Sequence, residues 1–242
     1  MKNAIITGVS RGLGEALALT LLQRGFSVTG IGRNNSNKLG GERYRYVSCD
    51  LARAGNIDPG VAPVLREIAG SRPQYVCLVN NAATVEPLGV FGAIPAEGVA
   101  ASLTPNLVAP VLLANLFCRV FNDATLQRRI INVSSGAAQS ALLGGGLYSI
   151  AKAGLEMLTK QLAAEHDAAT FRAITIRPGI IDTPMQQFAR SQSHDVLPSV
   201  AMFKDFHESG QLVAPDVVAA KIADKLVLGD VDQGRTYLYK EL

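Results

Sequence analysis

The feature that most constrains the fold is an alternation, along the whole chain, of short β-rich runs and longer helical patterns. Seven runs rich in β-branched and aromatic residues predict strands, at residues 3–7, 26–32, 44–50, 75–81, 129–135, 171–179 and 235–241. Helical patterns fall between them near residues 12–25, 57–69, 99–122, 148–167 and 215–228. Several runs are almost continuously apolar, as expected of strands covered by helices on both faces. The sequence therefore predicts an α/β Rossmann-type doubly wound parallel sheet of about seven strands.

The composition is that of one globular domain covering residues 1–242. The chain is 48% hydrophobic and 18% charged, and no repeat or low-complexity tract divides it. One long stretch, from about residue 180 to residue 210, contains Pro184 and Pro198 and lacks a clear period. We expect this stretch to be an irregular inserted segment that forms a substrate lid.

Charge and cysteine placement exclude several classes of function. The net charge of +3 comes from 23 basic and 20 acidic residues without a basic run, which argues against a nucleic-acid partner. Cys49, Cys77 and Cys118 stand singly, without the spacing of a disulfide framework or a metal site, and fit a reducing compartment. The N-terminal apolar run is too short for a signal peptide, and no uninterrupted apolar stretch approaches a membrane span. We expect a cytoplasmic protein with no metal and no membrane partner.

A glycine-rich turn, "TGVSRGLG", directly follows the first predicted strand. Gly8, Gly12 and Gly14 precede an apolar helix, where glycine allows a sharp turn and lets a pyrophosphate approach the free amides of the helix N-terminus. The GxxxGxG spacing differs from the usual GxGxxG, and a plain tight connection is the alternative. The second predicted strand ends in Arg33, where an NAD site commonly offers an acidic residue. With Arg11 it could bind a 2'-phosphate, which favours NADP(H), unless both arginines are merely solvated.

The stretch "YSIAK" places Tyr148 and Lys152 four residues apart within a predicted helix. Positions i and i+4 share one helix face, so the lysine charge would stabilise the ionised phenol and lower the pKa of Tyr148. Such pairs also occur by chance on surface helices, so the rest of the chain has to support a catalytic role.

Six motifs occur in one order along the chain: "TGVSRGLG", "CDL" at 49–51, "NNAA" at 80–83, "NVSS" at 132–135, "YSIAK" at 148–152 and "RPGIIDTPM" at 177–185. Together they resemble the short-chain dehydrogenase/reductase family over nearly the whole chain. The resemblance implies that Tyr148 is the general acid of carbonyl reduction and that Lys152 lowers its pKa and holds the nicotinamide ribose. It implies that Ser135 binds the substrate carbonyl, with the adjacent Ser134 as the competing choice. Asn106 would support a proton relay, although a structural helix break beside Pro105 is the alternative.

The resemblance also implies the cofactor contacts. The residues expected to bind NADP(H) are Gly8, Ser10, Arg11, Gly12, Leu13, Gly14, Arg33, Asp50, Leu51, Asn80, Asn81, Ala82, Val133, Tyr148, Lys152, Pro178, Gly179, Ile181 and Thr183. Each polar or glycine position among them could equally be a turn residue at a strand end.

The C-terminal part, from "RPGIIDTPMQQFAR" onward, is similar to the branch of sepiapterin reductases and bacterial benzil reductases. Pterin-reducing members are expected to have an aspartate in the last strand, where this chain has Leu238. A leucine cannot make the charge-assisted hydrogen bond that a pterin would need, so we expect a small ketone or vicinal diketone as substrate. The residues expected to line the substrate pocket are Ser135, Gln139, Leu142, Leu143, Gln186, Phe188 and Met202.

Three other functions remain open: a pterin side-chain reductase, a 3-oxoacyl thioester reductase, and a non-catalytic NADP(H)-sensing regulator. The intact Ser, Tyr and Lys set speaks against the regulator, because binding alone does not require a phenol. The resemblance further implies a homodimer or homotetramer that pairs through the helices containing Asn106 and Tyr148.

Overall fold

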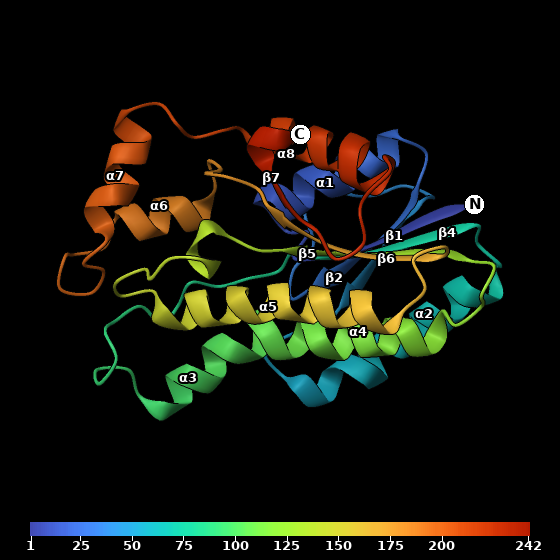
Figure 1. Ribbon diagram of the computed structural model, residues 1–242, viewed down its shortest axis with the longest axis horizontal. Coiled ribbons are helices and arrows are strands. Elements are labelled where there is room, and N and C mark those ends of the chain that lie inside the picture. Colours follow the sequence, from blue (N-terminus) through green and yellow to red (C-terminus); the bar gives the residue numbers. More distant parts are fainter.

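The computed structural model describes residues 1–242 and is built around a seven-stranded, fully parallel sheet (Figure 1). The strands are β1 Lys2–Thr7, β2 Ser27–Gly32, β3 Tyr44–Ser48, β4 Tyr75–Asn80, β5 Gln127–Val133, β6 Phe171–Arg177 and β7 Thr236–Leu238. Their spatial order is β3-β2-β1-β4-β5-β6-β7, which confirms the predicted fold class. The last strand is shorter than expected because the chain enters a 3₁₀ turn at Tyr239–Glu241.

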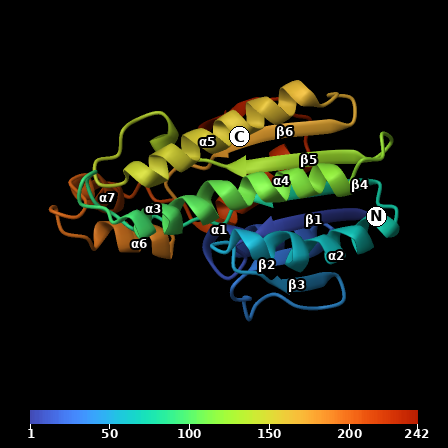
Figure 2. The same ribbon diagram turned by 90° about the horizontal axis from the view of Figure 1, so that it is seen from below.

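Helices cover both faces of the sheet (Figures 1 and 2). Helices α1 Gly12–Gln23 and α8 Pro215–Lys221 lie on one face. The other face carries α2 Ile57–Gly70, α3 Ala96–Leu103, α4 Ala109–Val120 and α5 Gly146–Glu165. Successive strand residues enter opposite cores: Ile6 packs in the α1 core of 24 buried residues, and Ile5 in the α2/α4 core of 23. Burial on both faces explains why the strand sequences are almost continuously apolar.

The strand order reverses at β1, which has β2 on one side and β4 on the other. At such a point the connecting segments diverge to opposite faces and leave a crevice beyond the carboxyl ends of the strands. Helices α6 Pro184–Arg190 and α7 Val200–Glu208 lie beyond this edge of the sheet (Figure 1).

The expectation that residues 180–210 are irregular is wrong, since α6 and α7 both fall within them. The side chain of Thr183 caps α6, and Pro184 occupies its first turn, where a missing N–H costs nothing. Val200 of α7 joins a small apolar cluster with Ala189 and Leu197. A segment interrupted by two prolines can thus contain two short helices whose apolar side chains share one cluster.

Helices α3 and α4 form one continuous segment through a π-helical turn at Thr104–Val108. By length and composition alone this segment, Ala96–Val120, could cross a membrane, with a mean hydropathy of 1.5, although polar residues such as Glu97 and Asn106 interrupt it. Here it lies along the sheet, with Leu113 and Phe117 buried in the core beneath it.

Candidate active site

The glycine turn after β1 is packed backbone against backbone. Gly8 has a φ of +74°, and a Cβ atom there would lie 2.9 Å from the Cα atom of Ala82. A Cβ atom on Gly14 would lie 2.2 Å from the carbonyl oxygen of Gly8. The hydroxyl of Thr7 accepts from the N–H groups of Asn81 and Ala82 at 3.0 and 2.9 Å, and ties the "NNAA" segment under the turn. Only glycine fits at these two positions, which lets the turn stay tight and brings an anion close to the backbone at the start of α1.

The segment after β6 reaches the same turn. The Cγ2 atom of Thr183 would lie 3.3 Å from a Cβ atom on Gly12. Gly179 has a φ of +77°, and Ile181 pairs with Val213 in an isolated bridge. Three more of the predicted cofactor residues lie outside the cores, just after the ends of β1, β3 and β6: Ser10, Asp50 and Pro178. Motifs far apart in the sequence therefore converge at the crevice.

Two arginines lie beside the crevice, in the glycine turn and after β2. Arg11 precedes α1, Arg33 follows β2, both are exposed, and neither forms an ion pair. The loop after Arg33 is held in place because the carboxylate of Glu15 accepts from the hydroxyl of Ser36 and from Lys38, the latter at 3.1 Å. Both guanidinium groups are therefore available to an anionic ligand.

Four predicted cofactor residues turn their side chains into the protein. Those of Leu13, Leu51 and Val133 are buried in the two cores, so only their backbone atoms can meet a ligand. The Asn80 amide is buried and donates to Oδ1 of Asn132 at 2.9 Å, within the sheet. That these four residues border the cofactor stays a prediction.

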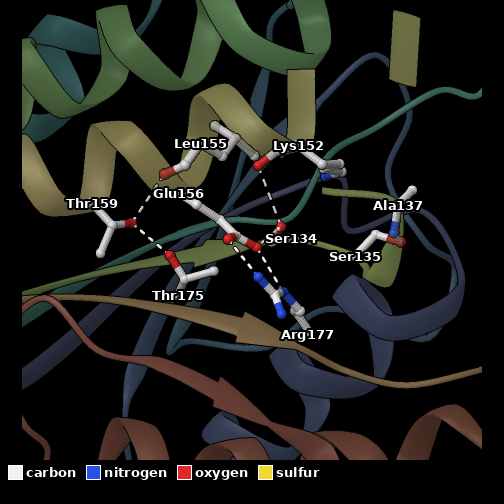
Figure 3. Close-up of polar contacts among 9 residues, drawn as sticks. All are labelled: Ser134, Ser135, Ala137, Lys152, Leu155, Glu156, Thr159, Thr175 and Arg177. Atoms are coloured by element: carbon white, nitrogen blue, oxygen red, sulfur yellow. Dashed lines mark hydrogen bonds and ion pairs between the residues drawn. The ribbon is translucent and has the colours of Figure 1, made fainter. Parts of the chain in front are cut away.

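Tyr148 and Lys152 lie on the first turns of α5. The Nζ atom of Lys152 lies 5.4 Å from the centre of the Tyr148 ring and donates to the carbonyl oxygen of Val133 at 2.7 Å. Ser135, directly after β5, is close enough to the Tyr148 hydroxyl to lower its pKa. Ser134 points the other way, toward α5, where it donates to Oε1 of Glu156 at 2.8 Å (Figure 3). The structure therefore brings Ser135, not Ser134, to the phenol.

The pKa values of the pair differ from the expectation that the ammonium lowers the pKa of Tyr148. Burial raises the pKa of Tyr148 to about 12, and the nearby Ser135 hydroxyl opposes this only in part. Burial lowers the pKa of Lys152 to about 8. The lysine lies over the ring, and its nitrogen is held by Val133, so desolvation outweighs charge attraction at the phenol oxygen. Tyr148 thus keeps its proton at neutral pH and has one to donate.

Asn106 occupies the π-helical turn between α3 and α4 and is fully buried. Its Oδ1 accepts from the N–H of Thr84, and its Nδ2 donates to the Thr84 carbonyl, both at 2.8 Å. The side chain therefore binds the segment after β4 to the interrupted helix, as the helix-break alternative requires. Its part in a proton relay stays a prediction.

The predicted substrate residues are only partly brought together. The buried amide of Gln186 donates to the carbonyl of Phe203 at 3.0 Å and accepts from Arg190 at 2.6 Å, so its place in the pocket stays a prediction. Leu142, beside Gly145, and Phe188, on α6, are half-buried. The others are exposed, on the loop after β5 and on α7: Gln139, Leu143 and Met202.

Sequence reasoning missed Phe91, whose aromatic side chain lies beside the start of α5. Its ring would lie 2.5 Å from a Cβ atom on Gly146, at the start of α5, and its side chain is 66% exposed. The N–H of Gly89 donates to the carbonyl of Gly144 at 2.8 Å, which holds the segment containing Phe91 against the loop that precedes α5. An aromatic residue between glycines, "GVFG", was the available signal.

Sequence reasoning also missed Glu156 and Arg177, which form an ion pair between α5 and the end of β6 (Figure 3). An acid one turn after Lys152 and an arginine ending an apolar strand were the available signals. The chain has no cluster of three or more His, Cys, Asp or Glu side chains that could hold a metal ion.

The family model described as short chain dehydrogenase matches residues 2–194. The chain belongs to the short-chain dehydrogenase/reductase family. It is 31% identical to the benzil reductase ((S)-benzoin forming) of Bacillus cereus, over 97% of each chain. It is 29% identical to the sepiapterin reductase of Xenopus tropicalis, over 92% of this chain and 90% of that one. The crystal structure of the KRED1-Pglu enzyme superposes with a TM-score of 0.85 at 27% identity, covering 98% of this chain and 100% of that one.

Membership in this short-chain dehydrogenase/reductase family, with reductases among its relatives, makes the chain an oxidoreductase acting on CH–OH or C=O groups. The family binds nicotinamide cofactors, and the glycine turn is the part of this chain whose geometry suits one.

Proposed function

We propose that the chain is a cytoplasmic, NADPH-dependent carbonyl reductase that transfers hydride to a small ketone or vicinal diketone, with Tyr148 as the general acid. The observation that carries the proposal is the convergence of Ser135, Tyr148 and Lys152 at one end of α5. A phenol next to a serine hydroxyl and backed by a buried lysine has no evident use in a protein that only binds a nucleotide.

The residues at the crevice fit a dinucleotide. The close backbone packing at Gly8 and Gly14 leaves room for a pyrophosphate, and Arg11 and Arg33 are free to bind a 2'-phosphate. No acidic residue follows Gly32 to favour the ribose hydroxyls of NAD. These features support NADP(H) as the cofactor.

The bound cofactor, when reduced, supplies the hydride. Ser135 accepts from the N–H of Ala137 at 3.2 Å, and its own proton, which faces the phenol, would turn to the substrate carbonyl oxygen when substrate binds. Tyr148, protonated at neutral pH, donates its proton to that oxygen as negative charge develops on it. Lys152 is held by Val133, which keeps its ammonium beside the phenol and in reach of a ribose. Asn106 holds the π-helical turn, which would order a water molecule in a proton relay that reaches Lys152.

The substrate class rests on the benzil reductases that the chain resembles and on the end of β7. Leu238 offers no carboxylate to a pterin, and the nearby Glu241 already accepts from the N–H of Leu238 at 3.2 Å and pairs with Arg235 at 3.6 Å. Exposed apolar side chains, Phe91 and Leu143, flank the start of α5 and suit an aromatic or apolar diketone. We assign residues 180–210 the role of a lid over that substrate within a single domain.

The outer face of α4 and α5 supports a homodimer or homotetramer. Four large apolar side chains there are between 39% and 60% exposed: Val108, Val111, Ile150 and Met157. A second copy of the chain would cover them. Sedimentation of wild type beside Met157→Glu tests this, because a charge in the interface would release monomers.

Absorbance at 340 nm tests the activity directly. We expect NADPH to be consumed with benzil or another 1,2-diketone, and consumed more slowly with sepiapterin or a 3-oxoacyl thioester. Tight NADPH binding without turnover across this panel would instead favour the sensing regulator. Fast turnover of sepiapterin alone would overturn the argument from Leu238.

A further inference from the structure

We propose that Ser134, Glu156 and Arg177 form a clamp that positions α5, and with it Tyr148 and Lys152, against the ends of β5 and β6. The inference rests on the proposed reductase function. These three residues touch no expected ligand directly, so they are positioning residues that act through the helix.

The clamp is a closed set of directional contacts (Figure 3). Arg177 donates from Nε to Oε1 of Glu156 at 2.7 Å and from a terminal nitrogen to Oε2 at 2.6 Å. The Ser134 hydroxyl donates to Oε1 of Glu156 at 2.8 Å and lies 3.3 Å from the carbonyl oxygen of Lys152. The strand ends that carry Ser135 and Pro178 are thereby fixed to the helix turn that carries Lys152.

The clamp adds directional contacts to a half-helix that is otherwise held by apolar packing. In the large core on this face of the sheet, α5 contributes Leu162 as a buried member and Leu158 at its margin, both in its C-terminal half. The half that carries Tyr148 contributes no member to either large core, although its side chains of Leu147, Ala151 and Leu155 are buried. Apolar packing is also non-directional, whereas a bidentate arginine–carboxylate pair fixes orientation.

A second set of polar contacts, centred on Thr159, joins α5 to the sheet further along the helix; we call the two sets together the polar seam. The hydroxyl of Thr159 accepts from Asn132 at 2.8 Å and from Thr175 at 2.7 Å, and donates to the carbonyl of Leu155 at 3.1 Å. Thus α5 meets β5 and β6 through polar contacts at two successive turns. Of the two sets, only the clamp contacts the helix turn that carries Lys152.

Burial sets this ion pair apart from a surface salt bridge. The side chains of Arg177 and Glu156 are 11% and 14% exposed. The pair Arg24–Asp224 has the same bidentate geometry, with both contacts at 3.0 Å, but its side chains are 37% and 47% exposed, and it joins the residue after α1 to the π-helical turn at Ile222–Val227. Arg24→Met is therefore a matched control, because it removes a bidentate arginine–carboxylate ion pair from a site outside α5.

The test uses two variants of the full-length enzyme with NADPH and benzil. Arg177→Lys keeps the charge but removes the fork, and the double variant Arg177→Met/Glu156→Leu removes both buried charges, an exchange that often preserves stability. We expect both to lower kcat about 10- to 100-fold, as a misplacement of about 1 Å does, while the KM for NADPH changes less than about 3-fold. Arg24→Met should keep the wild-type kcat.

A pair that served only stability would give a different pattern. The double variant would then regain the wild-type kcat once folded, as judged by circular dichroism and melting temperature, and that result would overturn the inference. Wild-type kcat in Arg177→Lys would overturn it independently if the double variant did not fold. Tyr148→Phe distinguishes failure of the proposed function from failure of the clamp inference. If Tyr148→Phe stays active, the proposed function is wrong. If Tyr148→Phe is inactive while the double variant is fully active, only the clamp inference is wrong.

Discussion

Substitution of Gly14 by alanine tests the glycine turn most sharply, because two opposing effects can be weighed. Gly14 lies in α1, where alanine would normally stabilise the helix by about 1 kcal/mol. The added methyl group, however, would lie 2.2 Å from the Gly8 carbonyl oxygen and 2.4 Å from Nδ2 of Asn81. Backbone cannot move aside as a flexible side chain can, and overpacking of this kind costs about 1–3 kcal/mol.

Since the closest approach, 2.2 Å, is to backbone, we expect the upper part of that range, about 2–3 kcal/mol. The clash then outweighs the helix propensity and leaves Gly14→Ala less stable by about 1–2 kcal/mol. For a chain of this size that lowers the melting temperature by about 3–6 °C. The turn must also open, so we expect NADPH affinity, measured by fluorescence titration, to fall at least about tenfold, or about 1.4 kcal/mol.

Gly70→Ala is the matched control, since Gly70 ends α2 and a Cβ atom there would have no neighbour within 4 Å. It should leave NADPH affinity unchanged and stability equal or higher. Wild-type stability and affinity in Gly14→Ala would refute the packing argument.

Three further predictions concern the cofactor, the seam and pH. Arg33→Ala should lower the preference for NADP(H) over NAD(H) by about 10- to 100-fold, as the loss of a charge-assisted hydrogen bond implies; an unchanged KM ratio would remove the 2'-phosphate assignment. Thr159→Val leaves the buried groups of Asn132 and Thr175 without their acceptor, so urea unfolding should show a loss of about 1–3 kcal/mol; an unaltered midpoint would contradict the polar seam. Reductase kcat/KM should fall as pH rises through about 8, because Lys152 loses its proton there while Tyr148 keeps its own to about 12; a flat profile from about pH 7 to 10 would show that the ammonium is not required.

The strands and the glycine turn were predictable because each depends on a local pattern. Continuous apolar runs indicated a sheet covered on both faces, and Gly8 and Gly14 indicated a turn that tolerates no Cβ. The pairing of Tyr148 with Lys152 was likewise local, one helical turn apart. Helices α6 and α7 were missed because each is short and Pro184 and Pro198 interrupt the segment that contains them.

The electrostatics of the site could not be derived from spacing alone. The i, i+4 rule placed Lys152 beside the Tyr148 ring but gave no information on burial, which raises one pKa and lowers the other. Gln186 was assigned to the pocket from its place in the chain, which gave no information on the contacts of its amide with Phe203 and Arg190. Arg177 and Glu156 are 21 residues apart, so their pairing required the register of α5 on β6.

The most direct measurement of the central claim is turnover by Tyr148→Phe at 340 nm, with NADPH binding measured separately by fluorescence. The variant removes one hydroxyl and keeps the ring under Lys152, so the account predicts near-normal NADPH affinity and a loss of at least about 100-fold in kcat with benzil. Wild-type turnover in this variant would contradict the assignment of Tyr148 as the proton donor.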